Sequence, residues 1–395
     1  MKIELLSPAG DLEKLKIAFL YGADAVYIGG KNYSLRANAN NFSLSEIREA
    51  CSFAHKINKK VYLAINIIFH NEDIKGIKEY IKEVVQAGID AFIVSEAFLI
   101  DYIVTNYPQV EVHVSTQNSI TNYEAVNLLK EKKVKRVVLA RELHKKEIKK
   151  IIDKTGLDIE IFIHGAMCTF YSGRCTLSNY QTNRDANRGG CSQVCRFMFE
   201  MENHNQPFTM ALKDLNLSNK IKDMIAIGVK SLKIEGRMRS VYYLATVNMC
   251  YRQIIDGYIN KSLTNKKLKE LENSLKLVAN RETSNHYFDH DESFQDHYYQ
   301  GRTEFSNQDF LALVLNYNKK TKICTLTQRN YFRVGDEVEF FTPKHQIINY
   351  RIEEIYNEKN KKIEIANHPE EIIKLKIDIE LEPYSMMRIK QNRRI

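Results

Sequence analysis

The most constraining feature of this sequence is a repeated unit in which a helical pattern ends on glycine and leads into an apolar run. Segments 21–26, 87–92 and 227–232 have this form, with Gly22, Gly88 and Gly228 as their second residues. A glycine just past a helix adopts the left-handed backbone conformation that ends it. The apolar run that follows is typical of a strand covered on both faces. The repeat therefore predicts alternating strands and helices with a parallel sheet.

Eight such strands are predicted in the first 235 residues, separated by segments with the 3.6-residue apolar period of helices. They are residues 4–7, 25–29, 61–67, 91–95, 111–115, 136–140, 159–164 and 231–235. Eight strands with intervening helices favour an α/β fold that closes into a (β/α)8 barrel of the TIM type over an open, doubly wound sheet.

The pattern changes after this region, and the chain length of 395 residues suits a barrel with a modest second domain. We predict the barrel over 1–255, with a long cysteine-bearing insertion at 166–212 after the seventh strand. A polar linker over 256–309 and a small antiparallel β-barrel over 310–395 follow. Strands of the small domain are predicted at 311–317, 323–328, 337–341, 350–355, 362–366 and 375–380.

Four of the seven cysteines lie close together in the insertion. Cys168 and Cys175 form a C-x6-C pair, and Cys191 and Cys195 form a C-x3-C pair in a segment rich in Gly, Asn, Arg and Ser. Such a loop can bring four thiols onto one ion or cluster. Zinc sites usually have two short pairs, so the spacing leaves zinc and iron–sulfur both open. The other three cysteines are predicted to be buried in helices and a strand of the two domains.

Arginines accompany these elements where the predicted strands end. Arg36, Arg141 and Arg237 follow strands, and Arg188 lies among the cysteines. The carboxyl ends of the strands carry the chemistry of (β/α)8 barrels. Planar guanidinium groups suit carboxylates and phosphates, so we predict an anionic substrate bound by these four residues. Alternatively, the arginines of the loop neutralise the thiolates.

Three residues are candidates for acid–base chemistry: Glu235, Asp185 and His164. Lone carboxylates beside arginines are more often ion-pair partners, and His164 is favoured as a core histidine. Because His164 precedes Cys168 by about one helical turn, a cysteine–histidine nucleophile pair is also considered. No H-E-x-x-H helix, G-x-S-x-G elbow or Walker loop is present in the sequence.

The charge balance is basic, with 58 Lys and Arg against 49 Asp and Glu, a net charge of +9. This favours a polyanion such as RNA as the partner, although a composition rich in Lys, Ile and Asn without Trp also fits a coding bias. No apolar run has the roughly 18 to 20 residues of a membrane span, and the first residues do not resemble a signal peptide. We therefore expect a cytoplasmic protein without membrane contact, in which clustered cysteines act as ligands or redox groups.

Several motifs resemble those of the peptidase U32 family, whose historical name is collagenase-like protease. The cysteine region carries HGAMC at 164–168, YSGRC at 171–175, NRGGC at 187–191 and the pair Cys195 and Arg196. The barrel adds YGADAVYIGG at 21–30 and LKIEGRM at 232–238, and the small domain adds VGDEVEF at 334–340. The resemblance covers most of the chain and is most specific at the cysteines.

Within that family the sequence looks most like the branch that hydroxylates tRNA. The resemblance implies prephenate-dependent conversion of the wobble uridine to 5-hydroxyuridine, with prephenate as co-substrate and an iron–sulfur cluster, of the [4Fe–4S] kind, on Cys168, Cys175, Cys191 and Cys195. The implied partners are the anticodon region of tRNA and a further subunit of the same family. The alternatives are a U32-type peptidase using Cys168 or a bound metal, and a non-catalytic assembly factor with a structural metal.

Overall fold

A computed structural model describes residues 3–35, 40–202, 206–298 and 310–389. The chain divides into two compact units, Met1–Glu304 and Phe305–Ile395.

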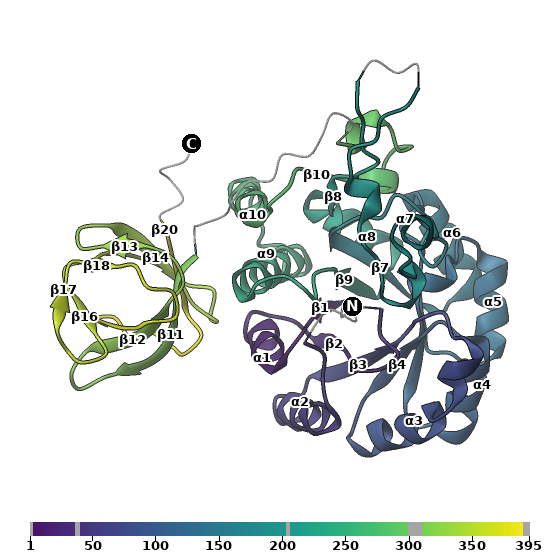
Figure 1. The fold of residues 1–395 in the computed structure, drawn as a ribbon, viewed down its shortest axis with the longest axis horizontal. Helices are drawn as coiled ribbons and strands as arrows, with labels where there is room; N and C mark the ends of the chain where they lie inside the picture. Colours follow the sequence, from purple (N-terminus) through teal and green to yellow (C-terminus); the bar gives the residue numbers. More distant parts are fainter. Residues whose placement is uncertain (1–2, 36–39, 203–205, 299–309, 390–395) are drawn as a thin grey trace. The chain divides into compact units, whose positions relative to one another are not determined.

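The first unit is a closed barrel of eight parallel strands surrounded by helices (Figure 1). Each strand pairs with the next one along the chain, and the last, β9, pairs with both β7 and β1, which closes the ring. The strands are β1 (Glu4–Pro8), β2 (Ala25–Gly29), β3 (Lys60–Ile65), β4 (Ala91–Val94), β5 (Glu111–Val114), β6 (Arg136–Val138), β7 (Asp158–Gly165) and β9 (Ser231–Ile234). The predicted TIM-like barrel is confirmed.

Helices alternate with these strands, and local signals mark their ends. Gly22, Gly88 and Gly228 have φ values of 112°, 95° and 95°, which confirms their predicted role as helix terminators. Ser43 and Glu46 form a capping box at the start of α2. The helices are α1 (Leu12–Leu20), α2 (Leu44–Lys56), α3 (Ile77–Gln86), α4 (Ala97–Asn106), α5 (Tyr123–Glu131), α6 (Lys145–Thr155), α8 (Ile221–Ile227) and α9 (Val241–Ile259).

The insertion leaves the carboxyl end of β7 and returns through β8 (Asp214–Asn216), which pairs antiparallel with β7. Its described residues include one short α-helix, α7 (Leu177–Thr182). The region expected to be a linker carries α10 (Asn265–Val278) and β10 (Thr283–Ser284), and β10 pairs with β8 within the first unit. The sequence did not predict β8 or β10, because two or three residues are too few to show a strand period.

The second unit contains an antiparallel sheet of eight strands that curves around an apolar core (Figure 1). Its order is β15-β14-β20-β11-β12-β19-β16-β17, and β13 (Phe332–Arg333) pairs separately with β18 (Ile365–Ala366). The bounds are β11 (Phe310–Asn318), β12 (Ile323–Gln328), β14 (Glu337–Phe341), β15 (Ile347–Arg351), β16 (Ile355–Asn357), β17 (Lys362–Ile363), β19 (Ile372–Lys376) and β20 (Met386–Ile389).

The antiparallel character of this unit was predicted correctly, but the bounds of three of its strands were not. The predicted strand 362–366 divides into β17 and β18, and the predicted strand 375–380 overlaps β19 only at the last two residues of β19. The predicted strand 350–355 is wrong: β15 ends at Arg351 and β16 begins at Ile355. Buried Ile352 lies between the two strands. The strands on either side of it have different partners, because β15 pairs with β14, whereas β16 pairs with β19 and β17. Because Ile352 is apolar, the alternation of apolar and polar residues continues across the break, and the sequence pattern does not show where β15 ends.

Candidate functional site

A cavity of about 70 Å³ lies at the carboxyl ends of the barrel strands, and we call it the mouth cavity. Two arginines and one lysine line it, together with one carboxylate side chain and several neutral polar groups. The lining residues are Tyr27, Leu35, Ala64, Asn66, Ile93, Ser115, Thr116, Gln117, Arg141, Phe162, Lys233, Glu235 and Arg237. The cationic groups outnumber the acidic one, so the cavity favours an anion.

Arg237 reaches the mouth cavity from the loop after β9. Its side chain is buried, with one guanidinium nitrogen donating to the Ser34 hydroxyl at 2.7 Å and another donating to the Asn41 side chain. Gly29, at the end of β2, leaves the necessary space: a Cβ there would collide with the guanidinium of Arg237. These neighbours fix Arg237 in one orientation.

Arg141 approaches from the end of β6. Its Nη1 donates to the backbone oxygen of Ala166 at 2.6 Å, and its guanidinium lies 3.9 Å from the centre of the Phe162 ring. The structure thus brings Arg141 and Arg237, two of the predicted anion ligands, into one cavity. Arg36, the third strand-end arginine, lies outside the described residues.

Sequence reasoning missed Lys233, which lines the same cavity from β9. Its side chain is buried, and its Nζ donates to a carboxylate oxygen of Glu160 at 2.9 Å. A signal was present, because Lys233 and Glu160 each interrupt an apolar strand, and charged residues are almost never fully buried unless they are paired.

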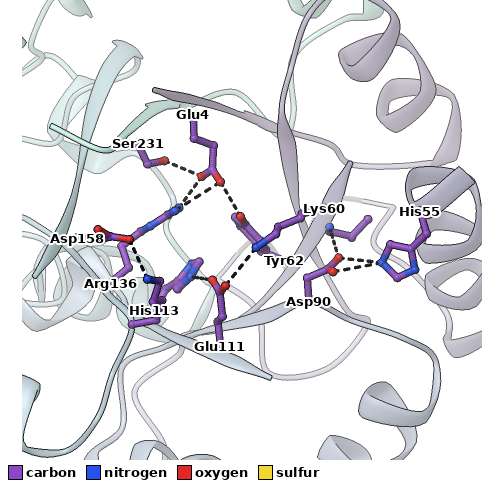
Figure 2. Close-up of polar contacts among 12 residues, drawn as sticks. Glu4, His55, Lys60, Tyr62, Asp90, Glu111, His113, Arg136, Asp158 and Ser231 are labelled. Atoms are coloured by element: carbon purple, nitrogen blue, oxygen red, sulfur yellow. Dashed lines mark hydrogen bonds and ion pairs between the residues drawn. The ribbon is translucent and has the colours of Figure 1, made fainter. Parts of the chain in front are cut away.

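Glu160 belongs to a series of four alternating charges inside the barrel, which we call the charge chain: Lys233, Glu160, Arg136 and Glu4. Arg136 donates to Glu160 at 3.0 Å and also pairs with Glu4. Figure 2 shows the far end, where the hydroxyls of Tyr62 and Ser231 donate to Glu4 at 2.7 and 2.9 Å. Burial alone would raise the pKa of Glu160, but the charges of Lys233 and Arg136 lower it to about 2.

The four cysteines of the insertion are free thiols: Cys168 and Cys191 are exposed, and Cys175 and Cys195 are partly buried. Desolvation raises the pKa of the Cys168 thiol, and repulsion from Cys175 and Cys191 adds to the rise. The pKa of Cys195 is raised by desolvation and then by Cys168 and Cys191. The thiols therefore lie within electrostatic range of one another, although no three His, Cys, Asp or Glu side chains in the described ranges are arranged as metal ligands.

Polar contacts attach the cysteine loop to the barrel. Arg188 pairs with Glu72 at 2.9 Å and with Asp73, and it donates to the backbone oxygen of Ile68 at 3.2 Å. The Ser119 hydroxyl donates to the backbone oxygen of Ser172 at 2.5 Å. Arg188 thus holds the loop against the segment after β3, and its predicted contact with substrate stays a prediction.

The three acid–base candidates lie in different surroundings. His164 is buried on β7, with its Nδ1 3.2 Å from the Tyr251 hydroxyl, and burial lowers its pKa to about 3. Asp185 caps a turn of the cysteine loop by accepting from the backbone of Asn187 at 2.9 Å. Glu235 is the candidate that lines the mouth cavity. Glu235 follows β9 directly. The backbone of Gly165, at the end of β7, lies close to it, since a Cβ at Gly165 would be 2.6 Å from the Glu235 backbone oxygen.

A larger hollow, of about 820 Å³, lies elsewhere on the barrel, between the end of α4 and the segments that lead into β5 and β6. It includes Val110 and Lys135, which precede those strands, so it is at the amino ends of the strands. In this fold that end serves stability, and chemistry belongs to the opposite end. We therefore place the candidate site at the mouth cavity and the cysteine loop.

The fold and this site define a (β/α)8-barrel protein whose cationic mouth lies beside a loop of four free thiols. The chain belongs to peptidase family U32: the model of that family matches residues 10–298, and the model of the U32 C-terminal domain matches residues 306–388. In the described part of the chain, no helix is long and apolar enough to cross a membrane.

Relatives with different names share this family. The chain is 44% identical to tRNA hydroxylation protein P1 of Bacillus subtilis, over 98% of this chain and 94% of that protein. It is 38% identical to the 23S rRNA 5-hydroxycytidine C2501 synthase of Escherichia coli, over 66% of this chain and 40% of that protein. It is also 31% identical to a collagenase of Porphyromonas gingivalis, over 89% of each chain.

Proposed function

We propose that this protein hydroxylates tRNA, converting the wobble uridine to 5-hydroxyuridine with prephenate as co-substrate. The observation that carries the proposal is the similarity, along 98% of the chain, to a relative named for tRNA hydroxylation. The relative named for 23S rRNA 5-hydroxycytidine synthesis supports RNA hydroxylation as the wider activity. The net charge of +9 is consistent with a polyanionic partner.

We further propose that Cys168, Cys175, Cys191 and Cys195 hold an iron–sulfur cluster of the [4Fe–4S] kind. Four free cysteines on one loop supply the donor set that such a cluster requires, and their thiols influence one another electrostatically. When bound, the cluster would pass electrons or hold the loop in shape. Arg141, which donates to the backbone two residues before Cys168, connects this loop to the mouth cavity.

Nucleoside analysis of a deletion strain tests the function. Total tRNA from wild-type, deletion and complemented strains is digested and its 5-hydroxyuridine derivatives are quantified by mass spectrometry. The cultures are grown without oxygen, so that an oxygen-dependent route cannot replace the missing enzyme. We expect at least a tenfold loss in the deletion strain and recovery with the wild-type gene. An unchanged amount of 5-hydroxyuridine in the deletion strain would refute the proposal.

A peptidase is the second candidate, and the relative named as a collagenase is the observation that favours it. A cysteine nucleophile needs an adjacent base. The side chain of His164 contacts Tyr251 and Tyr243 of α9, which supports its role as a core histidine. Cleavage of gelatin by the purified protein, abolished by Cys168→Ala and retained by Cys51→Ala, would favour the peptidase instead.

A further inference from the structure

We infer that Lys233 is the third anion-binding group of the mouth cavity and that it binds, with Arg141 and Arg237, a carboxylate of a small substrate. The inference rests on the proposed function, in which a small carboxylic acid is the co-substrate. It adds to that function a binding residue inside the barrel and the part of the ligand that this residue recognises.

The size and depth of the cavity favour a small ligand over an RNA phosphate. Lys233 and Arg237 are each only 4% exposed, and the space beside them is about 70 Å³. Such a space accommodates a carboxylate end and few further atoms, whereas a nucleic-acid backbone needs cations on an accessible surface. The remainder of the ligand would extend from the mouth cavity.

The charge chain supports a protonated Lys233. If its four members are charged, the positive charges of Lys233 and Arg136 balance the negative charges of Glu160 and Glu4. A neutral Lys233 would leave one negative charge uncompensated inside the barrel, which is costly. Glu160 therefore acts as a positioning residue, because it holds the ammonium group of Lys233 at 2.9 Å and its negative charge opposes the lowering of the Lys233 pKa by burial.

Aromatic rings enclose the cationic groups. The Nζ of Lys233 lies 4.5 Å from the centre of the Tyr27 ring and 5.3 Å from that of Phe162. The guanidinium of Arg141 also lies over the Phe162 ring, 3.9 Å from its centre. These rings limit contact with water, and electrostatic attraction is stronger where water is excluded. A carboxylate in the mouth cavity would thus be held more firmly than one on the protein surface.

Calorimetric titration of the full-length protein, purified without oxygen, tests the inference. The probes are prephenate, malonate and inorganic phosphate. The test variant is the double substitution Lys233→Met with Glu160→Gln, which removes the lysine without leaving the Glu160 charge unpaired. The Glu160→Gln change by itself removes a negative charge near the cavity and would strengthen anion binding, so any weakening comes from the loss of Lys233.

The matched control is Lys60→Met. Lys60 also stands on a barrel strand with a carboxylate partner, Glu111 at 3.1 Å (Figure 2). It lies at the amino end of β3, whereas the mouth cavity lies at the carboxyl ends of the strands. We expect the dissociation constant for prephenate to rise at least tenfold in the double variant and to stay within twofold of the wild type in the control. Circular dichroism verifies that both variants are folded.

Three results would overturn the inference. The first is a folded double variant that binds prephenate as the wild type does. The second is a double variant that loses affinity for inorganic phosphate alone, which would assign Lys233 to a phosphate group. The third is a wild-type protein that binds neither prephenate nor malonate. These titrations contain no RNA substrate, so the tRNA nucleoside analysis decides the proposed function separately.

Discussion

The Nζ of Lys233 lies 2.9 Å from a carboxylate oxygen of Glu160, although the two residues are 73 positions apart in the chain. They meet because β9 pairs directly with β7 where the barrel closes. This ion pair connects the mouth cavity to Arg136 and Glu4 farther down the barrel.

Removing one partner of this pair should destabilise the barrel strongly. We expect Lys233→Met to lower the free energy of unfolding by about 3 kcal/mol, because it leaves a buried carboxylate with one cation fewer. Adding Glu160→Gln should recover part of the loss, since the unpaired charge is then removed. Urea unfolding of the full chain measures both, with Lys60→Met as the exposed control. Equal free energies of unfolding for Lys233→Met and Lys60→Met would contradict the assignment of Lys233 to a buried charge chain.

His164 should make the barrel sensitive to acid. Its pKa is about 3 in the fold, against an ordinary value of 6.5, so below pH 6.5 the unfolded chain binds a proton that the folded chain does not. Stability should therefore fall as the pH drops, by about 2 to 3 kcal/mol from this residue between pH 6.5 and 4.5. His164→Gln should flatten that slope, whereas His55→Gln at an exposed histidine serves as the control. An unchanged slope in His164→Gln would show that His164 binds protons equally in the folded and unfolded chain.

The pairing of Arg188 with Glu72 and Asp73 should restrain the cysteine loop. We expect Arg188→Ala to favour local opening by about 1 kcal/mol, the scale of a partly exposed ion pair. Limited proteolysis within residues 166–212 should then be about five times faster. Arg329→Ala, which removes an ion pair with Glu370 in the other unit, provides the control. Cleavage at the wild-type rate would mean that other contacts hold the loop.

The seven cysteines should separate into two groups by reactivity. Cys51, Cys250 and Cys324 are buried, and burial raises the pKa of Cys51 and of Cys324 to about 12. In metal-free protein, a thiol reagent should modify Cys191 and Cys168 at least tenfold faster than these three, as measured by peptide mass spectrometry.

Metal content tests the same division of the cysteines. Protein purified without oxygen should contain iron and sulfide. It should also absorb broadly at about 400 nm, as thiolate-bound iron–sulfur clusters do. Cys175→Ser should lose most of the iron, and Cys324→Ser should retain it. A colourless protein that contains zinc would show that the four cysteines of the loop bind zinc and not an iron–sulfur cluster.

The fold class could be predicted from the sequence because the patterns that indicate it involve neighbouring residues. Gly22, Gly88 and Gly228 mark helix ends through their own backbone conformation, and the apolar runs after them are strands whatever their partners are. The break between β15 and β16 was not readable, because it depends on which strands pair on either side of Ile352.

The site was readable only in part. Arg141 and Arg237 were expected at the mouth, since the carboxyl ends of the strands meet there in any barrel of this type. The partners of Arg188 and His164 were not predicted, because Glu72, Asp73 and Tyr251 are distant in sequence and carry no mark of the contact.

The sequence by itself determined the eight strands, the helices between them and the loop that carries four cysteines. Those properties follow from the conformational preferences and polarity of neighbouring residues. Only the tertiary structure decided that Lys233, Glu160, Arg136 and Glu4 form one chain of alternating charges. Each strand sets which side chains point into the barrel, but closure of the ring decides which of them meet.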